Sequence, residues 1–381
     1  MVLLPTSFLP SIEENNNCEF SMIDVIANVS EITPEWLTQA LKSSGSIKSS
    51  VTSVNLGVIG TGIGLMAELA RLELTFAAPE DMPSVIIAKI AAQNENREVA
   101  RILDFYNREA NFYNKVADQV PFKVPDSYFA KVNDETYDCI ILMQDLGDVS
   151  PNDQLVGASK EEAFSAIERI ASMHAMFWGK VGTPDSSWMF DLMNDFEAKR
   201  LQTLLYMPAL APTIEKFDTF LDADSRDVLT RVGEQYQEVW SRNMSSQETF
   251  VHGDYRQDNF IYSKGSLDAQ VLDWQISGRG RGIFDLTYFV CQSLKPDVRR
   301  SIEKELVEFY VEKLKEGGVT DYSFEQCWGD YRTMVLGCLV YPVTVCGTLD
   351  LANDRGRALA ECMLERNLSA ISDLGSAELL N

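Results

Sequence analysis

Three side chains late in the sequence have the types and spacing that phosphoryl transfer needs. Asp254 follows a His-Gly pair, Asn259 comes five residues later, and Asp273 ends an apolar run. A carboxylate such as Asp254 could accept the proton of a substrate hydroxyl, while the oxygens of Asn259 and Asp273 could bind a cation. Oxygen ligands suit Mg²⁺, which proteins hold through one or two carboxylates together with substrate phosphates. The three residues therefore predict a magnesium-dependent phosphoryl-transfer site.

Short β-strands should bring these residues together. The apolar segments 250–251, 260–262 and 270–272 have the composition of strands, and the polar residues 263–266 form a turn between the last two. The polar side chains stand at the ends of these neighbouring β-elements. We therefore expect them to share one site.

The order of these motifs resembles the catalytic loop and metal-binding segment of the protein-kinase-like fold. His252-Gly-Asp and Asp273-Trp-Gln are similar to the motifs of the branch that phosphorylates small molecules. That branch includes aminoglycoside phosphotransferases, choline kinases and ecdysteroid-kinase-like proteins. A glycine-rich run at 278–282, followed closely by Asp285, supports the resemblance. Over residues 50–300 the motifs most resemble the ecdysteroid-kinase-like group and its bacterial relatives.

The resemblance implies an α+β, bilobal, protein-kinase-like fold. The first lobe would be an antiparallel β-sheet with one major helix, and the second would be larger and mainly helical. Asp254 would act as the catalytic base, and Asn259 and Asp273 would hold Mg²⁺. His252 would orient the catalytic loop, and Asp285 would support it through hydrogen bonds to the backbone.

Lys89 is a charge within the otherwise apolar strand predicted at 84–90. A buried lysine is costly unless it is paired. The helix predicted from Val99 to Val116 offers Glu109 on a largely apolar face. By resemblance the two form the lysine–glutamate pair of kinases, in which the lysine orients the α- and β-phosphates. The alternative is a solvent-exposed lysine and an unrelated surface glutamate.

Two further segments could contact a nucleotide. A glycine-rich turn lies between the strands predicted at 50–57 and 68–76, and glycine lets backbone N–H groups approach phosphates, although a purely structural turn would explain it equally well. Strands at 128–130 and 139–143 complete the sheet and lead to the segment that resembles the hinge, where the backbone would meet adenine. The expected contacts are Gly60, Thr61, Gly62 and Gly64 in the turn, and Met143, Gln144 and Asp145 in the hinge.

The length of 381 residues exceeds what one hydrophobic core usually holds, which predicts two lobes. We expect a loose leader at residues 1–30 and a nucleotide-binding lobe at 31–146. Residues 147–381 would form the second lobe, with the catalytic loop, the metal site and the substrate cleft.

The second lobe should be helical. Ser159 and Glu162 form a capping-box pattern before a helix that carries His174, which we expect to be a packed or hydrogen-bonded residue. Residues 185–248 contain helical segments rich in aromatic residues, which either form buried amphipathic faces or line a substrate cleft. Three more helices are predicted at 298–316, 324–347 and 352–374.

The chain is acidic, with 33 basic and 57 acidic residues and a net charge of -24. Nucleic acid and anionic membranes are therefore poor partners, since both attract clustered lysine and arginine. Seven cysteines without a CxxC pair predict reduced thiols and a cytoplasmic location. No signal peptide, membrane insertion or obligate protein partner is expected, because no apolar run approaches roughly 18 residues and the apolar start lacks basic residues.

These features predict a kinase that uses ATP, with GTP as the alternative donor, and Mg²⁺. The acceptor would be a small-molecule hydroxyl, with a lipophilic or sterol-like alcohol favoured over an amino-sugar or amino-alcohol. The alternative is a catalytically idle nucleotide-binding or scaffold protein, although such a protein would have no chemical need for Lys89, Asp254, Asn259 and Asp273 together. The stretch from Asp273 to Asp285 is too short for the activation loop of a protein kinase.

Overall fold

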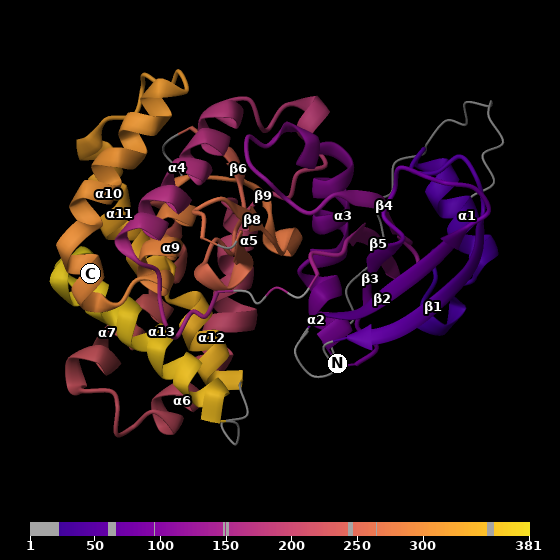
Figure 1. Ribbon diagram of the computed structural model, residues 1–381. Coiled ribbons are helices and arrows are strands. Elements are labelled where there is room, and N and C mark those ends of the chain that lie inside the picture. The colour runs from indigo at the N-terminus through magenta and orange to yellow at the C-terminus, as the bar shows by residue number, and fades with distance from the viewer. Residues whose placement is uncertain are drawn as a thin grey trace.

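The protein has two parts, a β-sheet flanked by helices and a larger, mainly helical part (Figure 1). This arrangement confirms the predicted bilobal α+β fold. The computed structural model describes residues 23–59, 66–94, 96–147, 149, 152–242, 247–263, 265–348 and 354–381. Within those ranges no helix is both long enough and apolar enough to cross a lipid bilayer.

The sheet of the first lobe is antiparallel throughout, as predicted, and its strands follow the order β1-β2-β3-β5-β4. The strands are β1 (Val51–Ile59), β2 (Ala67–Phe76), β3 (Val85–Ala91), β4 (Ser127–Val132) and β5 (Cys139–Gln144). The domain limits expected at residues 30 and 146 stay predictions.

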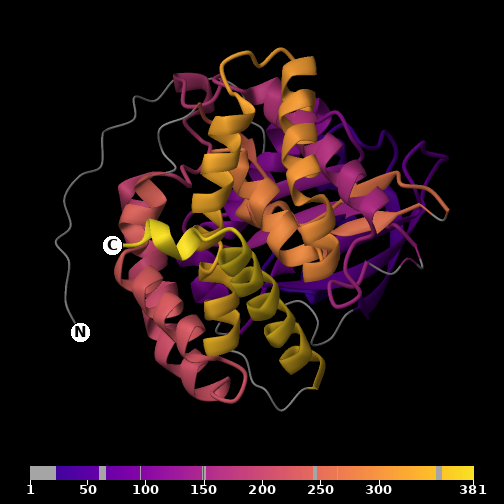
Figure 2. The same ribbon diagram turned by 90° about the vertical axis from the view of Figure 1, so that its left-hand side faces the viewer.

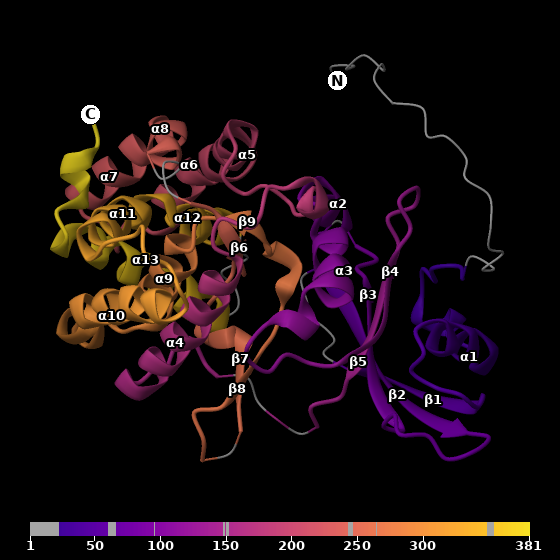
Figure 3. The same ribbon diagram turned by 90° about the horizontal axis from the view of Figure 1, so that it is seen from above.

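The two faces of this sheet meet different helices, because side chains alternate along a strand. Ala88 and Ile90 of β3 share a hydrophobic core with α1 (Pro34–Ser43). Lys89 lies between them in the sequence and points to the opposite face. That face packs against α3 (Phe105–Lys115), which lies between the sheet and the second lobe (Figure 3). The strand period thus directs Lys89 towards α3.

The single helix predicted at 99–116 is wrong. The chain forms α2 (Asn96–Ile102) and α3, with a break at Asp104. Asp104 has a φ of 57°, in the left-handed region, where a right-handed helix cannot continue. Its carboxylate accepts a hydrogen bond of 2.6 Å from the Tyr137 hydroxyl, which fixes the break against the loop between β4 and β5.

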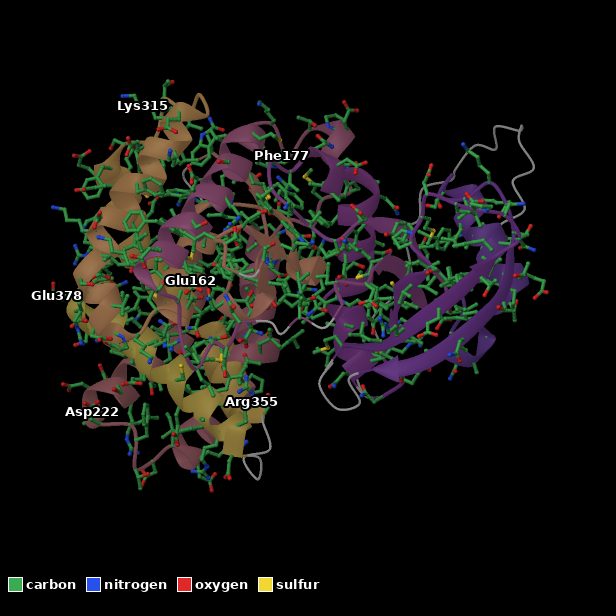
Figure 4. The ribbon with its side chains drawn as sticks, viewed as in Figure 1. Glu162, Phe177, Asp222, Lys315, Arg355 and Glu378 are labelled. Carbon is green, nitrogen blue, oxygen red and sulfur yellow. The ribbon has the colours of Figure 1, made fainter. Side chains whose placement is uncertain are left out.

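The second lobe is mainly helical, as predicted. Its helices are α4 (Lys160–Phe177), α5 (Asp195–Arg200), α6 (Met207–Lys216), α7 (Ala223–Glu234), α8 (Tyr236–Ser241), α9 (Ile283–Ser293), α10 (Pro296–Glu316), α11 (Phe324–Gly337), α12 (Val340–Thr348) and α13 (Asp354–Asp373), and a π-helical segment (Leu201–Tyr206) joins α5 to α6. The capping residue Ser159 starts α4, and its capping box with Glu162 is present (Figure 4). Thr33 likewise caps α1.

The helix predicted at 324–347 is also wrong, because the chain forms two helices there. Cys338 and Leu339 separate α11 from α12. Pro342 in the first turn of α12 explains the separation, since it has no N–H to donate to the carbonyl of Cys338 and its ring would clash with that carbonyl. The helix α9 was not predicted from the sequence. Every one of its residues is buried, so its sequence lacks the polar face that marks an amphipathic helix.

Two small two-stranded sheets hold the segment that carries the predicted site. The strand β6 (Thr249–Val251) pairs with β9 (Gly278–Gly280), and β7 (Phe260–Tyr262) pairs with β8 (Ala269–Val271). The three predicted strands are therefore present, but β6 pairs with β9 rather than with β7. Figure 2 shows the helical lobe from the side opposite the sheet, with its orange and yellow helices in front.

The lobes are joined by an aromatic stack and by ion pairs. The ring of Phe112 on α3 lies parallel to that of Trp274, with centroids 3.7 Å apart and an interplanar angle of 4°. Trp274 also contacts the ring of His252 at 4.5 Å. Lys123 of the first lobe pairs at 2.5 Å with Asp268 beside β8, and within the second lobe Asp153 pairs at 3.0 Å with Arg355 of α13, which Figure 4 labels. One core cluster runs from α3 through the second lobe.

Replacing Phe112 with alanine should lower the free energy of unfolding by about 3–5 kcal/mol, because a buried ring is lost and Trp274 loses its stacking partner. Urea-induced unfolding followed by circular dichroism measures this change. Phe220→Ala is the control, since its ring is 42% exposed and its loss should change the free energy of unfolding by only about 0.5 kcal/mol. Equal effects of the two substitutions would contradict the role given to the stack.

Candidate active site

The ammonium group of Lys89 lies between two carboxylates. Its Nζ is 2.7 Å from Oε2 of Glu109 on α3 and 3.3 Å from Oδ1 of Asp273 in the second lobe. Burial lowers the pKa of Lys89, but the neighbouring carboxylates of Glu109 and Asp273 outweigh burial and raise the pKa above its ordinary value. Lys89 is therefore a fixed positive charge where the lobes meet.

Asp273 and Asn259 stand side by side at the ends of β8 and β7. The register pairs Phe260 with Val271, and the Leu272 N–H donates to the Asn259 carbonyl at 2.9 Å. Asp273 follows with a φ of 63°, a left-handed conformation that turns the chain sharply. The side-chain amide of Asn259 donates its N–H groups to Asp254, so its Oδ1 is the atom left for a cation. Two oxygen donors of this kind fit Mg²⁺.

Polar groups hold the carboxylate of Asp254 on several sides. Arg256 Nε donates to Oδ1 at 3.0 Å, and Asn259 Nδ2 donates to Oδ2 at 3.0 Å. The guanidinium of Arg256 is itself held by Asp258 Oδ2 at 2.9 Å. Burial and the adjacent Asp254 carboxylate raise the pKa of the Tyr288 phenol well above its ordinary value. Asp254 is thus a carboxylate of defined orientation.

His252 and Asp285 fix the backbone of the loop that precedes Asp254. The Nδ1 atom of His252 accepts the Asp254 N–H at 3.1 Å, so the proton is on Nε2, which donates to the Leu272 carbonyl at 2.9 Å. The buried carboxylate of Asp285 accepts the N–H groups of His252 at 2.7 Å and Gly253 at 2.8 Å. In this geometry both side chains position the loop.

His174 is a hydrogen-bonded helix residue, as predicted. It is buried, and its ring nitrogens lie 3.2 Å from Asp285 Oδ2 and 2.8 Å from the Tyr310 hydroxyl. The ring therefore joins α4 and α10 to the carboxylate that holds the backbone of residues 252 and 253.

The expected nucleotide contacts are described in part. Met143 and Gln144 end β5, and the Gln144 N–H donates to the Asp126 carbonyl at 2.8 Å. Asp145 accepts the Gly147 N–H at 2.8 Å and pairs with Arg71 at 2.6 Å, which is the behaviour of a turn residue. The predicted phosphate contacts Gly60, Thr61, Gly62 and Gly64 lie outside the described residues.

Several residues around the site were not found from the sequence. Tyr341 donates to the Gly253 carbonyl at 3.2 Å, and the Gln154 side chain contacts Arg256. Arg108, next to Glu109, is buried and contacts the segment after Asp273. Its signal was a second charge beside Glu109 in a largely apolar helix. The tyrosine and the glutamine come from distant helix and loop segments, and no local pattern marks them.

Comparison with known proteins gives a family and a fold. The model of the ecdysteroid kinase-like family matches residues 62–319, more than half of the chain. A similar structure is that of a microcompartment-associated aminopropanol kinase, with a TM-score of 0.55 and 12% identity over 89% of this chain and 98% of that chain. Another, from Ralstonia eutropha and assigned as an aminoglycoside phosphotransferase, has a TM-score of 0.51 and 13% identity over 91% and 98% of the chains. A search of curated protein sequences finds no significant match.

Replacing Asp285 with asparagine should lower the free energy of unfolding by about 1–3 kcal/mol, because the amide group cannot accept from both loop N–H groups and leaves one unpaired in the interior. Hydrogen exchange at residues 252–254 should become faster. Chemical unfolding and exchange followed by mass spectrometry measure the two effects.

Asp227→Asn is the matched control. Asp227 is exposed and pairs with Arg231 one helical turn away, so its replacement should leave the exchange at residues 252–254 unchanged. If Asp285→Asn exchanged at those residues as slowly as the unmodified protein, Asp285 would not be what holds the loop.

Proposed function

Because this chain belongs to the ecdysteroid kinase-like family, we propose that it is a small-molecule kinase that transfers the γ-phosphoryl group of ATP to a hydroxyl group. GTP is the alternative donor. The observation that carries the proposal is the contact of Lys89 with both Glu109 and Asp273. A cation beside two oxygen donors, in a position shared by both lobes, is what a bound nucleotide with its metal requires.

The first step is to hold the nucleotide. Lys89 would bind the phosphate tail, and Glu109 keeps its ammonium group in place. Asn259 Oδ1 and Asp273 would hold the metal, which supplies neutralisation of the phosphate charge. With its carboxylate on the metal, Asp273 would leave the Lys89 ammonium group available for a phosphate oxygen.

The second step is to activate the acceptor. Asp254 would accept the proton of the acceptor hydroxyl. The hydroxyl oxygen would bond to the γ-phosphorus as the bond between that phosphorus and the β-phosphate oxygen breaks, and ADP would leave. Arg256 and Asn259 hold one carboxylate oxygen each, which orients Asp254 before the acceptor arrives. A preoriented base does not need to be ordered during the reaction. The geometry supports the role of Asp254 as base in this proposal.

We propose an acceptor without an essential amino group, since two acidic residues near the site, within the part of the chain that the structure describes, are already paired. Glu197 pairs with Arg200 at 2.6 Å, and Asp258 pairs with Arg256 at 2.9 Å. Both glutamate and arginine of the first pair are largely buried. An ammonium group on the acceptor would have to displace an arginine to reach either carboxylate, which leaves a buried cation unpaired.

Exposed apolar side chains on α2 and α5 favour a lipophilic alcohol in this proposal. Phe196 on α5 is 73% exposed, and Ile102 at the end of α2 is 47% exposed. The two helices touch there, because the Arg200 guanidinium donates to the Ile102 carbonyl and Phe196 lies one turn before Arg200. Val99, one turn before Ile102, is also exposed. These residues, which we call the apolar rim, can cover the lipophilic part of an acceptor.

Removal of the metal-binding carboxylate tests the nucleotide site. With Mg²⁺ present, Asp273→Ala should weaken ATP binding at least about tenfold, which corresponds to about 1.4 kcal/mol. Without Mg²⁺, the substitution should not weaken ATP binding, because the carboxylate then only pairs with Lys89 and repels the phosphates. Isothermal titration calorimetry measures both affinities.

Asp268→Ala provides the control from the same hairpin, since Asp268 is exposed and pairs with Lys123. It should leave both affinities unchanged. If ATP and GTP do not bind, or bind without regard to Mg²⁺ and Asp273, the kinase proposal fails and the idle scaffold alternative takes its place.

The apolar rim can be tested with a panel of hydroxyl compounds that contains sterol-like alcohols, amino-alcohols and amino-sugars. Formation of ADP should be fastest with a lipophilic alcohol. The double substitution Ile102→Ser with Phe196→Ser should raise the KM for that alcohol at least about tenfold, since each buried apolar side chain contributes about 1.5–3 kcal/mol, and should leave the affinity for ATP unchanged. Preferred turnover of an amino-sugar would contradict the lipophilic assignment.

A further inference from the structure

We propose that Arg108 is a positioning residue that holds the metal-binding segment and the catalytic loop against α3, an inference that rests on the kinase function proposed above. Arg108 precedes Glu109, and successive residues of an α-helix point about 100° apart. Glu109 meets Lys89 of the sheet, whereas Arg108 reaches the second lobe. The same helix therefore carries one contact to each lobe.

The guanidinium of Arg108 binds backbone carbonyls at two places. Its Nε donates to the Ser277 carbonyl at 2.9 Å, and its Nη2 donates to the Ile276 carbonyl. Its Nη1 donates to the Leu103 carbonyl at 3.2 Å, at the junction of α2 and α3. Ile276 and Ser277 follow Asp273 by three and four residues. Arg108 thus connects the start of the glutamate-bearing helix to the chain just after the metal-binding carboxylate.

The Ile276 carbonyl also touches the catalytic loop. Gly253 has a φ of +85°, and a Cβ atom added there would overlap the Ile276 carbonyl oxygen. Only glycine lets the loop come this close, and the next residue is Asp254. One carbonyl oxygen therefore lies between the Arg108 guanidinium and the loop that carries the proposed base. A shift of residues 276–277 would move both Asp273 and Asp254.

The surroundings of Arg108 favour this fixed position. The guanidinium lies over the ring of Phe190 at 4.3 Å, and Arg200 lies near the same ring at 5.1 Å. Burial lowers the pKa of Arg108 to about 10, and the nearby Glu197 carboxylate opposes that effect. The side chain stays charged at neutral pH, so its hydrogen bonds persist. The planar fork of arginine matches two successive carbonyls, which the single ammonium of lysine cannot do.

The role predicts a selective loss of magnesium-dependent binding. Arg108→Met keeps an apolar stem on Phe190 but removes the donors. We expect the ratio of ATP affinity with Mg²⁺ to ATP affinity without it to fall about tenfold, because residues that orient metal ligands typically affect affinity by 10–100-fold. Calorimetry with a non-hydrolysable ATP analogue measures both affinities. In a Lys89→Met background, the same substitution should cost less than about threefold, since coupled residues are not additive.

Two further variants separate positioning from stability. Arg97→Met is the matched control, since Arg97 lies on α2, pairs with Asp138 at 2.6 Å and does not touch residues 276–277. It should leave the magnesium ratio unchanged even if it lowers the melting temperature. Should Arg108→Met fail to fold, Arg108→Lys retains the charge and should still lower the ratio at least about threefold.

The possible results are distinct. A folded Arg108→Met or Arg108→Lys protein with an unchanged magnesium ratio overturns the inference, as does an equal fall with Arg97→Met. A fall confined to the Arg108 variants and reduced without Lys89 supports it. If the unmodified protein binds no nucleotide, the proposed function fails first and this inference fails with it.

Discussion

The burial of the Lys89 ammonium group within an apolar strand is the constraint on which the rest of the structure depends. An unpaired charge in this largely buried position would be costly, so the fold has to bring a carboxylate to it, and each lobe supplies one. The strand period points Lys89 towards α3, the break at Asp104 sets where α3 begins, and Glu109 meets the ammonium at 2.7 Å. Asp273 reaches the same cation from the second lobe, directly before the tryptophan that stacks on α3. One positive charge therefore holds together β3, α3 and the segment around Asp273.

Main-chain groups carry much of the positioning around this charge. Asp285 accepts the N–H groups of residues 252 and 253, and Arg108 donates to carbonyls of residues 276 and 277. Hydrogen bonds to the backbone fix a loop without using the side chains that would do the chemistry. The side chains of Asp254 and Asn259 are then oriented by Arg256 and by each other.

The sequence predicted the sheet, the capped start of α4 and the strands around Asp254, because alternation, capping residues and turns are local signals. It failed at Asp104, where a polar residue breaks the helix through a long-range hydrogen bond to Tyr137, and at α9, which has no polar face. The cost of a buried charge predicted that Lys89 needs a partner, and the resemblance to kinases pointed to Glu109. The contacts of Arg108, Tyr341 and Gln154 could not be predicted, since they depend on which distant backbone groups and side chains come within reach.

The core that runs from α3 into the second lobe has a consequence for folding. Phe112 packs against Trp274, more than 150 residues away in the sequence, within one continuous apolar cluster. A fragment that ended near residue 146 would expose that face of α3 to water. Most of the chain must therefore unfold as one cooperative unit, whereas α1 and the sheet face beneath it form a separate cluster that can open locally. The chain passes from the first lobe to the second near residue 146, but the part that unfolds together with the second lobe already includes α3.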